Sequence, residues 1–187
     1  MNDALRLLLS RRSTPPAGLT APGPSPDELT TLLTIAARVP DHGKLAPWRF
    51  IVFEGEGRER AGQVLVDVAR AQRPDATPEQ IEAERKRMTA APLVIAVVST
   101  AAPHPKIPEY EQLLSAAACC QNLLIAADAM GYGASWVTNW FSYDRAALER
   151  LGVAETEKIA GVVHIGTRKE RLEDRTRPDL AKIVTRF

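Results

Sequence analysis

The chain has 187 residues, which is enough for one domain with a sizeable hydrophobic core. Its 24 lysine and arginine residues nearly balance 23 acidic residues, and the net charge of +1 argues against a nucleic-acid or membrane-surface role. Polar residues interrupt even the longest apolar stretch, residues 113–130, which argues against a membrane span. The chain begins with an early acid and late basic residues, the reverse of a secretory signal, so we expect a soluble cytoplasmic protein.

The residue types that usually carry protein-based catalysis or metal binding form no recognisable pattern. Cys119 and Cys120 are the only cysteines, and because they are adjacent they provide neither a disulfide framework nor a metal-ligand spacing. The three histidines are far apart, and the chain has no nucleophile elbow, zinc-protease motif, phosphate-binding loop or dinucleotide-binding glycine motif. We therefore expect no metal site and no catalytic nucleophile.

The first half of the chain predicts helices that are marked by clear start signals. A first helix is expected over Asp3–Ser10, followed by a proline-rich surface connector. Ser25, Pro26 and Glu28 form a capping box with proline at the first helical position, and the helix that they open is expected to run to about residue 38, before Pro40. The apolar, β-rich residues 48–55 then predict a strand.

The middle of the chain predicts two further helices, a buried strand and a long helix. Residues 57–72 have helical periodicity, and residues 77–92 open with a capping box of Thr77 and Gln80 and are strongly charged, as in an exposed helix. Residues 93–100 are apolar without alternation, as in a central strand buried on both faces. Residues 111–130 predict a helix that is apolar nearly all round. One way to bury such a helix in so small a protein is to pack it against a second copy.

The last third predicts strands over residues 134–140 and 158–167, with a short helix opened by Asp144 between them. The final residues, "KIVTRF", could add an edge strand. Together the elements predict one layered α/β or α+β domain over residues 1–187.

Two short segments are candidate binding sites. "SRRS", from Ser10 to Ser13, either complements the end of the first helix, which we favour on this segment alone, or surrounds a phosphate with guanidinium and hydroxyl groups. "RVPDHGKLAPWRF", which contains Arg38, His42 and Lys44, is either a proline-stiffened connector or a rigid loop for a planar anionic ligand.

Taken together, these two segments resemble the FMN-dependent nitroreductase family. The run "SPDELTTLLTIAARVPDHGKLAPWRFIVFEGEGRERAG" carries the resemblance, and "P-D-H-G-K-x-x-P-W-R-F" is its most specific part. The chain is most similar to the short, YdjA-like branch of NAD(P)H nitroreductases, in order and over nearly its whole length. This resemblance implies an α+β, three-layer fold with a central mixed β-sheet, and an obligate homodimer that shares two FMN molecules between its subunits.

The resemblance also assigns a set of positions to FMN: Arg11, Arg12, Ser13, Arg38, His42, Trp136, Val137 and Thr138. The first three would hold the phosphate and ribityl end, the next two would reach the same flavin from the other subunit, and the last three would lie along the isoalloxazine. The helix end from Ala126 to Gly131 matches a segment assigned to NAD(P)H, and Arg175 and Arg177 resemble a basic pair that contacts phosphate in larger members.

One position departs from the family pattern. Broader nitroreductases carry a basic residue at the flavin edge where this chain has Pro15. Because a positive group there favours the reduced flavin anion, we expect Arg38 to supply the missing charge.

The function implied by the resemblance is an oxidoreductase that passes a hydride from NAD(P)H through FMN to a nitroaromatic, quinone or similar acceptor by a ping-pong cycle. The chemistry would reside on FMN, with no catalytic protein residue. Two alternatives remain open: a flavin enzyme of the same fold that performs enone reduction, dehalogenation or oxidation, and a non-catalytic flavin-binding redox module.

Overall fold

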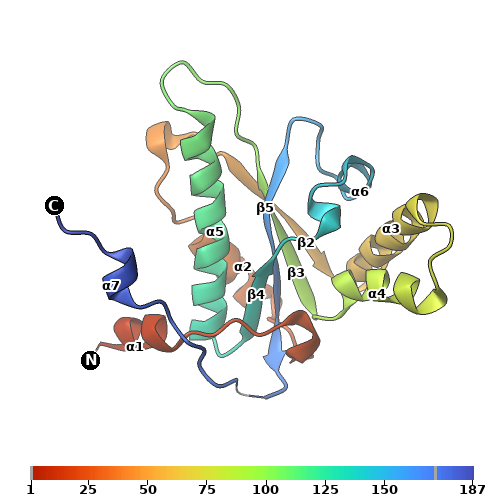
Figure 1. Cartoon of the computed structure of the whole chain (residues 1–187), viewed down its shortest axis with the longest axis horizontal. Coiled ribbons are helices and arrows are strands. Elements are labelled where there is room, and N and C mark those ends of the chain that lie inside the picture. Colours follow the sequence, from red (N-terminus) through yellow and green to blue (C-terminus); the bar gives the residue numbers. More distant parts are fainter. Residues whose placement is uncertain (1, 171) are drawn as a thin grey trace.

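The centre of the fold is a five-stranded sheet, seen in a computed structural model that describes residues 2–170 and 172–187 (Figure 1). The strand order is β1–β5–β3–β2, with β4 also pairing with β5. The strands are β1 (Leu19–Thr20), β2 (Trp48–Glu54), β3 (Leu93–Ser99), β4 (Gly133–Val137) and β5 (Lys158–Arg168). Every residue of β3 is buried, as its unbroken apolar sequence predicts.

The expectation of a mixed sheet is wrong for the residues that the structure describes, because every strand pairing among them is antiparallel. The connection between β2 and β3 shows the physical reason. It consists of two helices, α3 (Glu56–Gln72) and α4 (Pro78–Thr89), of which the second returns the chain to where the first began. The end of β2 therefore pairs with the start of β3, Glu54 opposite Leu93, and the two strands run in opposite directions.

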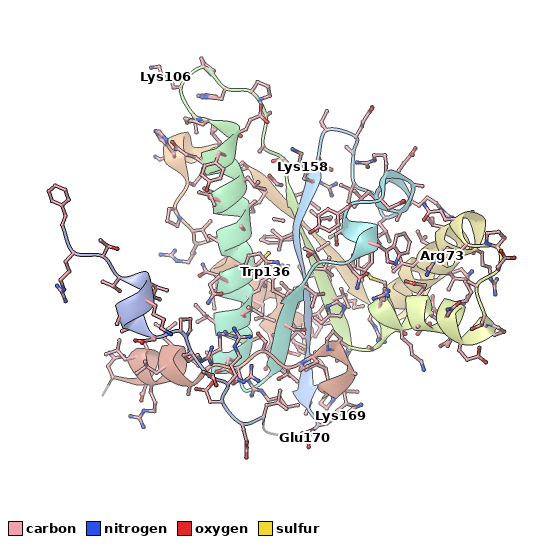
Figure 2. The ribbon with its side chains drawn as sticks, in the orientation of Figure 1. Arg73, Lys106, Trp136, Lys158, Lys169 and Glu170 are labelled. Atoms are coloured by element: carbon pink, nitrogen blue, oxygen red, sulfur yellow. The ribbon has the colours of Figure 1, made fainter. Side chains whose placement is uncertain are left out.

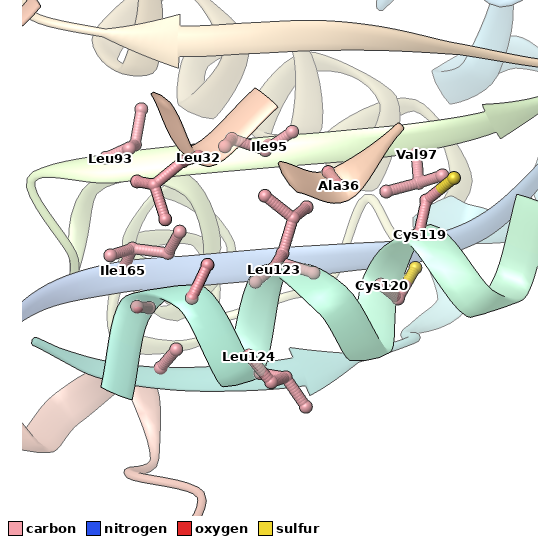
Figure 3. Close-up of a cluster of buried hydrophobic side chains, with 14 residues drawn as sticks. Leu32, Ala36, Leu93, Ile95, Val97, Cys119, Cys120, Leu123, Leu124 and Ile165 are labelled. Atoms are coloured by element: carbon pink, nitrogen blue, oxygen red, sulfur yellow. The ribbon is translucent and has the colours of Figure 1, made fainter. Parts of the chain in front are cut away.

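Helices cover both faces of the sheet, which confirms the three-layer α+β fold (Figure 1). Helices α2 (Pro26–Ala36) and α5 (Glu109–Ala129) pack on one face, and α3 and α4 pack on the other. Figure 3 shows the first of these cores, in which Leu32 and Leu123 meet Ile95 and Ile165 of the sheet. Period-2 alternation along β3 and β5 sends neighbouring residues into opposite layers.

Local signals placed most helix starts correctly. Both predicted capping boxes are present: Ser25 and Glu28 bond reciprocally at 2.8 and 3.3 Å, and Thr77 and Gln80 do so at 2.9 and 3.3 Å. The remaining helical elements are α1 (Asp3–Ser10), α6 (Arg145–Arg150), α7 (Leu180–Ile183) and short 3-10 turns over Pro16–Gly18, His42–Lys44 and Trp140–Ser142.

The elements differ from expectation in two places. The predicted strand over residues 134–140 ends at Val137, because Asn139 caps a 3-10 turn by accepting a hydrogen bond from the backbone N–H of Trp140 at 2.8 Å. The tail "KIVTRF" forms no edge strand: Asp179 caps α7 there, and exposed residues follow. None of the described helices is long and apolar enough to cross a membrane.

A buried carboxylate joins the layer of α3 and α4 to the turn after β4. The side chain of Glu84 is 4% exposed and accepts hydrogen bonds from Arg73 at 2.7 Å, Arg87 at 2.5 Å and the Trp140 indole at 2.7 Å. Burial opposes ionisation of Glu84, but these bonds outweigh it and hold its pKa below the ordinary value. The ionised form therefore stabilises the fold.

Replacing Glu84 by alanine should lower the free energy of unfolding by about 2–3 kcal/mol, because buried donors lose their acceptor. The matched control is Glu82→Ala on the same helix, which removes a half-exposed carboxylate paired with Arg85 and should cost less than about 0.5 kcal/mol. Urea unfolding measures both values.

The stabilisation by Glu84 should also depend on pH. A lowered folded-state pKa means that the contribution is present above the ordinary glutamate pKa and is lost as the pH falls through the lowered value. The gap in stability between the wild type and Glu84→Ala should therefore shrink in acid. A gap that is constant with pH would contradict this assignment.

Candidate functional site

The segment after α1 gathers guanidinium and hydroxyl groups at one place. Arg11 donates a hydrogen bond to the hydroxyl of Ser13 at 3.4 Å, and Arg12 donates to the backbone carbonyl of Glu173 at 3.0 Å. Arg177 joins them, because its guanidinium reaches the backbone carbonyl of Arg11 at 3.4 Å. Three arginines from the two ends of the chain therefore lie close together.

A surface pocket of about 920 Å³ opens beside this segment. It lies among the end of α1, the carboxyl end of α5 and the chain after β5, and its lining includes Arg12, Asp128, Arg168 and Lys169. Arg168 is paired with Asp128 and also donates a hydrogen bond to the carbonyl of Gly131 at 3.2 Å, and it thereby ties the carboxyl end of α5 to β5. The segment from Ala126 to Gly131 lies at this helix end, partly buried in the core.

The same segment is joined to the edge of the sheet. The backbone N–H of Thr14 bonds to the carbonyl of Ala134 at 2.9 Å, at the start of β4. Trp136, Val137 and Thr138 follow directly along the chain, with Trp136 and Thr138 exposed and Val137 half-buried. The structure therefore brings the predicted groups Arg11–Arg12–Ser13 and Trp136–Val137–Thr138 to one edge of the sheet.

The position of the Trp136 indole depends on a missing side chain. A Cβ on Gly161 would collide with Trp136 Nε1 and would lie 2.8 Å from Cys120 Sγ. Trp136 thus lies over bare backbone of β5, against the middle of α5 (Figure 2). Only glycine at position 161 leaves room for this flat aromatic surface.

The other predicted residues, Arg38 and His42, belong to the segment after α2, which contacts other parts of α5. The backbone carbonyl of Arg38 accepts a hydrogen bond from Asn122 Nδ2 at 3.0 Å, and His42 Nδ1 lies 2.7 Å from Glu111 Oε2. The helix spans about 25 Å, at 1.5 Å per residue, from Glu111 to Asp128, which lines the pocket beside Arg12. In Figure 1 the orange loop after α2 flanks the amino end of α5, and the red segment after α1 flanks its carboxyl end. Within one chain, His42 therefore does not reach the segment Arg11–Ser13.

The loop that carries His42 has an unusual backbone. Gly43, Lys44 and Ala46 have φ values of 72°, 57° and 45°, in the left-handed region that costs non-glycine residues energy. The Asp41 carboxylate stabilises this path by accepting the N–H groups of Leu45 at 3.0 Å and Ala46 at 2.9 Å. The loop is therefore fixed rather than free to adapt.

The side chains of Lys44 and Arg175 form few contacts with the rest of the chain. The side chain of Lys44 is exposed and forms no hydrogen bond or ion pair with the described residues. Arg175 contacts Asp174 only through its backbone N–H, whereas the guanidinium of Arg177 pairs with that carboxylate at 2.6 Å. Arg177 is thus the better placed member of the predicted basic pair.

The exposed side of α5 is apolar. Tyr110 is 70% exposed and Leu114 is 50% exposed, and half-buried Ala118 and Ile125 continue this stripe with exposed Gln121 between them. These spacings of three and four residues put the side chains on one helix face. Leucines of α1 add to the apolar surface near the other end of the helix.

The thiols on α5 are unsuited to nucleophilic chemistry. Burial raises the pKa of Cys119 to about 11 and that of Cys120 to about 12, so neither is a thiolate near neutral pH. Their sulfur atoms pack in the core shown in Figure 3. Among the described residues, no cluster of three or more His, Cys, Asp or Glu side chains could hold a metal ion.

Two polar residues at this site were missed by sequence reasoning. Asp41 could have been found, because an aspartate that precedes a glycine often bonds the backbone a few residues on. Glu111 gives no comparable signal, since 69 positions separate it from His42.

Comparisons with known proteins identify the family of this chain. Residues 8–167 match the family model described as "Nitroreductase family". The chain is 36% identical over 186 residues to "Putative NAD(P)H nitroreductase YdjA" of Escherichia coli (strain K12), covering 99% of this chain and 100% of that one.

Solved structures share the fold. A nitroreductase-like family protein from Bacillus cereus is 24% identical, with a TM-score of 0.84 and coverage of 100% of this chain and 97% of the other. A nitroreductase from Bacteroides fragilis NCTC 9343, solved with bound FMN, is 21% identical, with a TM-score of 0.72 and full coverage of both chains. The family model covers most of the chain and the identity to YdjA extends over nearly all of it, and the chain therefore belongs to the nitroreductase family.

Proposed function

We propose that this protein is an FMN-dependent oxidoreductase that passes a hydride from NAD(P)H to a nitroaromatic, quinone or similar acceptor. Membership of the nitroreductase family supports this reaction class, as do the name of YdjA and the FMN bound to the Bacteroides fragilis protein. The observation that carries the proposal is the meeting of Arg11, Arg12 and Ser13 with the strand edge that holds Trp136.

The residues present fit this cofactor. Guanidinium and hydroxyl groups are the donors that phosphate prefers, and Arg177 adds a further cation to the Arg11–Ser13 segment. Trp136 offers an exposed aromatic surface on the same edge, with no Cβ at Gly161 to displace it. One edge of the sheet can thus take both the charged and the planar part of the cofactor.

When bound, FMN supplies the hydride chemistry, and the chain provides binding and orientation. Arg11, Arg12 and Ser13 would hold the phosphate and ribityl end. The strand residues Trp136–Val137–Thr138 would lie along the ring and limit access of water to it. The buried cysteines, with raised pKa values, take no part.

We further propose that two copies of this single-domain chain form the working unit, with each FMN held by both. His42 lies beside the amino end of α5, about 25 Å from the carboxyl end that adjoins Arg12 of the same chain, so it cannot act with that arginine. If two α5 helices pair antiparallel about a twofold axis near Ala118, the amino end of one meets the carboxyl end of the other. Each His42 then approaches the Arg11–Ser13 segment of the neighbouring chain, and the apolar stripe on α5 becomes buried.

The reaction class is tested by absorbance spectroscopy of the purified protein. It should bind FMN, its flavin absorbance should bleach on anaerobic addition of NADH or NADPH, and a nitroaromatic or quinone should restore it. A colourless protein that takes up no FMN would contradict the proposal. Bound flavin that neither nicotinamide bleaches would instead favour a non-catalytic redox module.

The proposed dimer is tested by placing a charge on the apolar stripe. Leu114→Asp should shift the sedimentation coefficient from dimer to monomer and weaken FMN binding with it, because an unpaired carboxylate would be buried at the interface. Tyr143→Asp is the matched control: Tyr143 is 72% exposed beside α3 and α6, away from α5, and its replacement should change neither property. A Leu114→Asp variant that remains a dimer at low concentration would exclude this face as the interface.

The sharing of each site between subunits is tested by mixing two variants. Arg12→Ala should weaken FMN binding about 10- to 100-fold, since it removes charge-assisted bonds to phosphate, and Arg38→Ala should also lower the flavin midpoint potential. Arg60→Ala, an exposed cation on α3, should do neither. When Arg12→Ala and Arg38→Ala chains exchange partners, each mixed dimer regains one intact site, so sites of wild-type affinity should reappear. Their absence would mean that each site lies within one chain.

A further inference from the structure

On the basis of the proposed function, we infer that Glu111 is a positioning residue, which holds His42 in the orientation needed at the flavin site of the neighbouring chain. Glu111 lies in the first turn of α5, and its carboxylate contacts the His42 ring across two segments that are far apart in the sequence. Nothing in the local sequence of either segment requires this pair.

The contact fixes the ring and its tautomer. His42 Nδ1 lies 2.7 Å from Glu111 Oε2, and an ionised carboxylate can only accept, so Nδ1 carries the proton. Nε2 of His42 is then the ring nitrogen that remains available to a ligand, and the His42 side chain is 62% exposed. Without Glu111 the ring could rotate about its side-chain bonds.

The backbone that carries His42 is already rigid, so fixing the imidazole ring also fixes its position relative to the rest of the chain. Asp41 binds the N–H groups of Leu45 and Ala46, and a side chain on Gly43 would collide with Ile107. The backbone path is thus set by contacts that precede and follow His42. Glu111 adds the remaining constraint, the direction of the ring.

Glu111 has no other side-chain role among the described residues. Its carboxylate forms no hydrogen bond or ion pair apart from the one with His42. Glu109 supplies the same negative charge in the same first turn and forms no such contact at all. A general benefit of acidic residues at the start of a helix would therefore apply to both, whereas contact with His42 is specific to Glu111.

The experiment is a double-mutant cycle on FMN affinity with Glu111→Ala, His42→Ala and the double variant. Each single change should weaken FMN binding about 3- to 10-fold, as expected for the loss of one hydrogen bond, and the double variant should bind as weakly as His42→Ala alone. Glu111→Gln, which keeps an acceptor oxygen, should stay within about 2-fold of the wild type. Glu109→Ala is the matched control and should leave FMN affinity unchanged.

The side chain of Glu111 is 46% exposed, so these variants should fold, and urea unfolding and sedimentation confirm fold and assembly. Losses that add in the double variant, or a Glu111→Ala affinity equal to that of Glu109→Ala, would overturn the positioning role. A Glu111→Gln variant as weak as Glu111→Ala would also overturn it. If the wild-type protein binds no FMN at all, the proposed function fails first, so the two failures are distinguishable.

Discussion

The need to bury α5 is the constraint on which the rest of this structure depends. The helix is apolar nearly all round, and one chain can cover only part of it with the sheet and α2. The inner side forms the core with Leu32 and Ile165, while Tyr110 and Leu114 are left on the outer side. In the proposed dimer a second copy covers that side, and the hydrophobic effect would drive the pairing.

The same helix organises the proposed chemistry. Its carboxyl end lies by Arg12 and its amino end by His42, so the two parts of the proposed site lie about 25 Å apart in one chain. Antiparallel pairing would join each part to the complementary part of the other chain. Burial raises the pKa values of the two thiols on α5, so Cys119 and Cys120 serve as core residues rather than as nucleophiles.

Trp136 and the loop at His42 are both held rigidly, but by different interactions. Trp136 is held by steric exclusion, because Gly161 leaves only enough room for the indole. The loop at His42 is held by charge and hydrogen bonding, with the Asp41 carboxylate offsetting a left-handed backbone at Lys44 and Ala46. If this loop reaches a neighbouring chain, as we propose, such fixation means that less conformational freedom is lost when the ligand binds.

The sequence by itself determined the local elements and the list of candidate residues. Capping boxes and apolar periodicity act between residues a few positions apart, so α2, α4 and β3 could be predicted from them, and the resemblance supplied Arg11–Ser13 and Trp136–Thr138. Only the tertiary structure decided that every described strand pairing is antiparallel, that Thr14 bonds to β4, and that Glu111 meets His42. These contacts join residues far apart in the chain, and they depend on how the helices pack on the sheet, which no short stretch of sequence encodes.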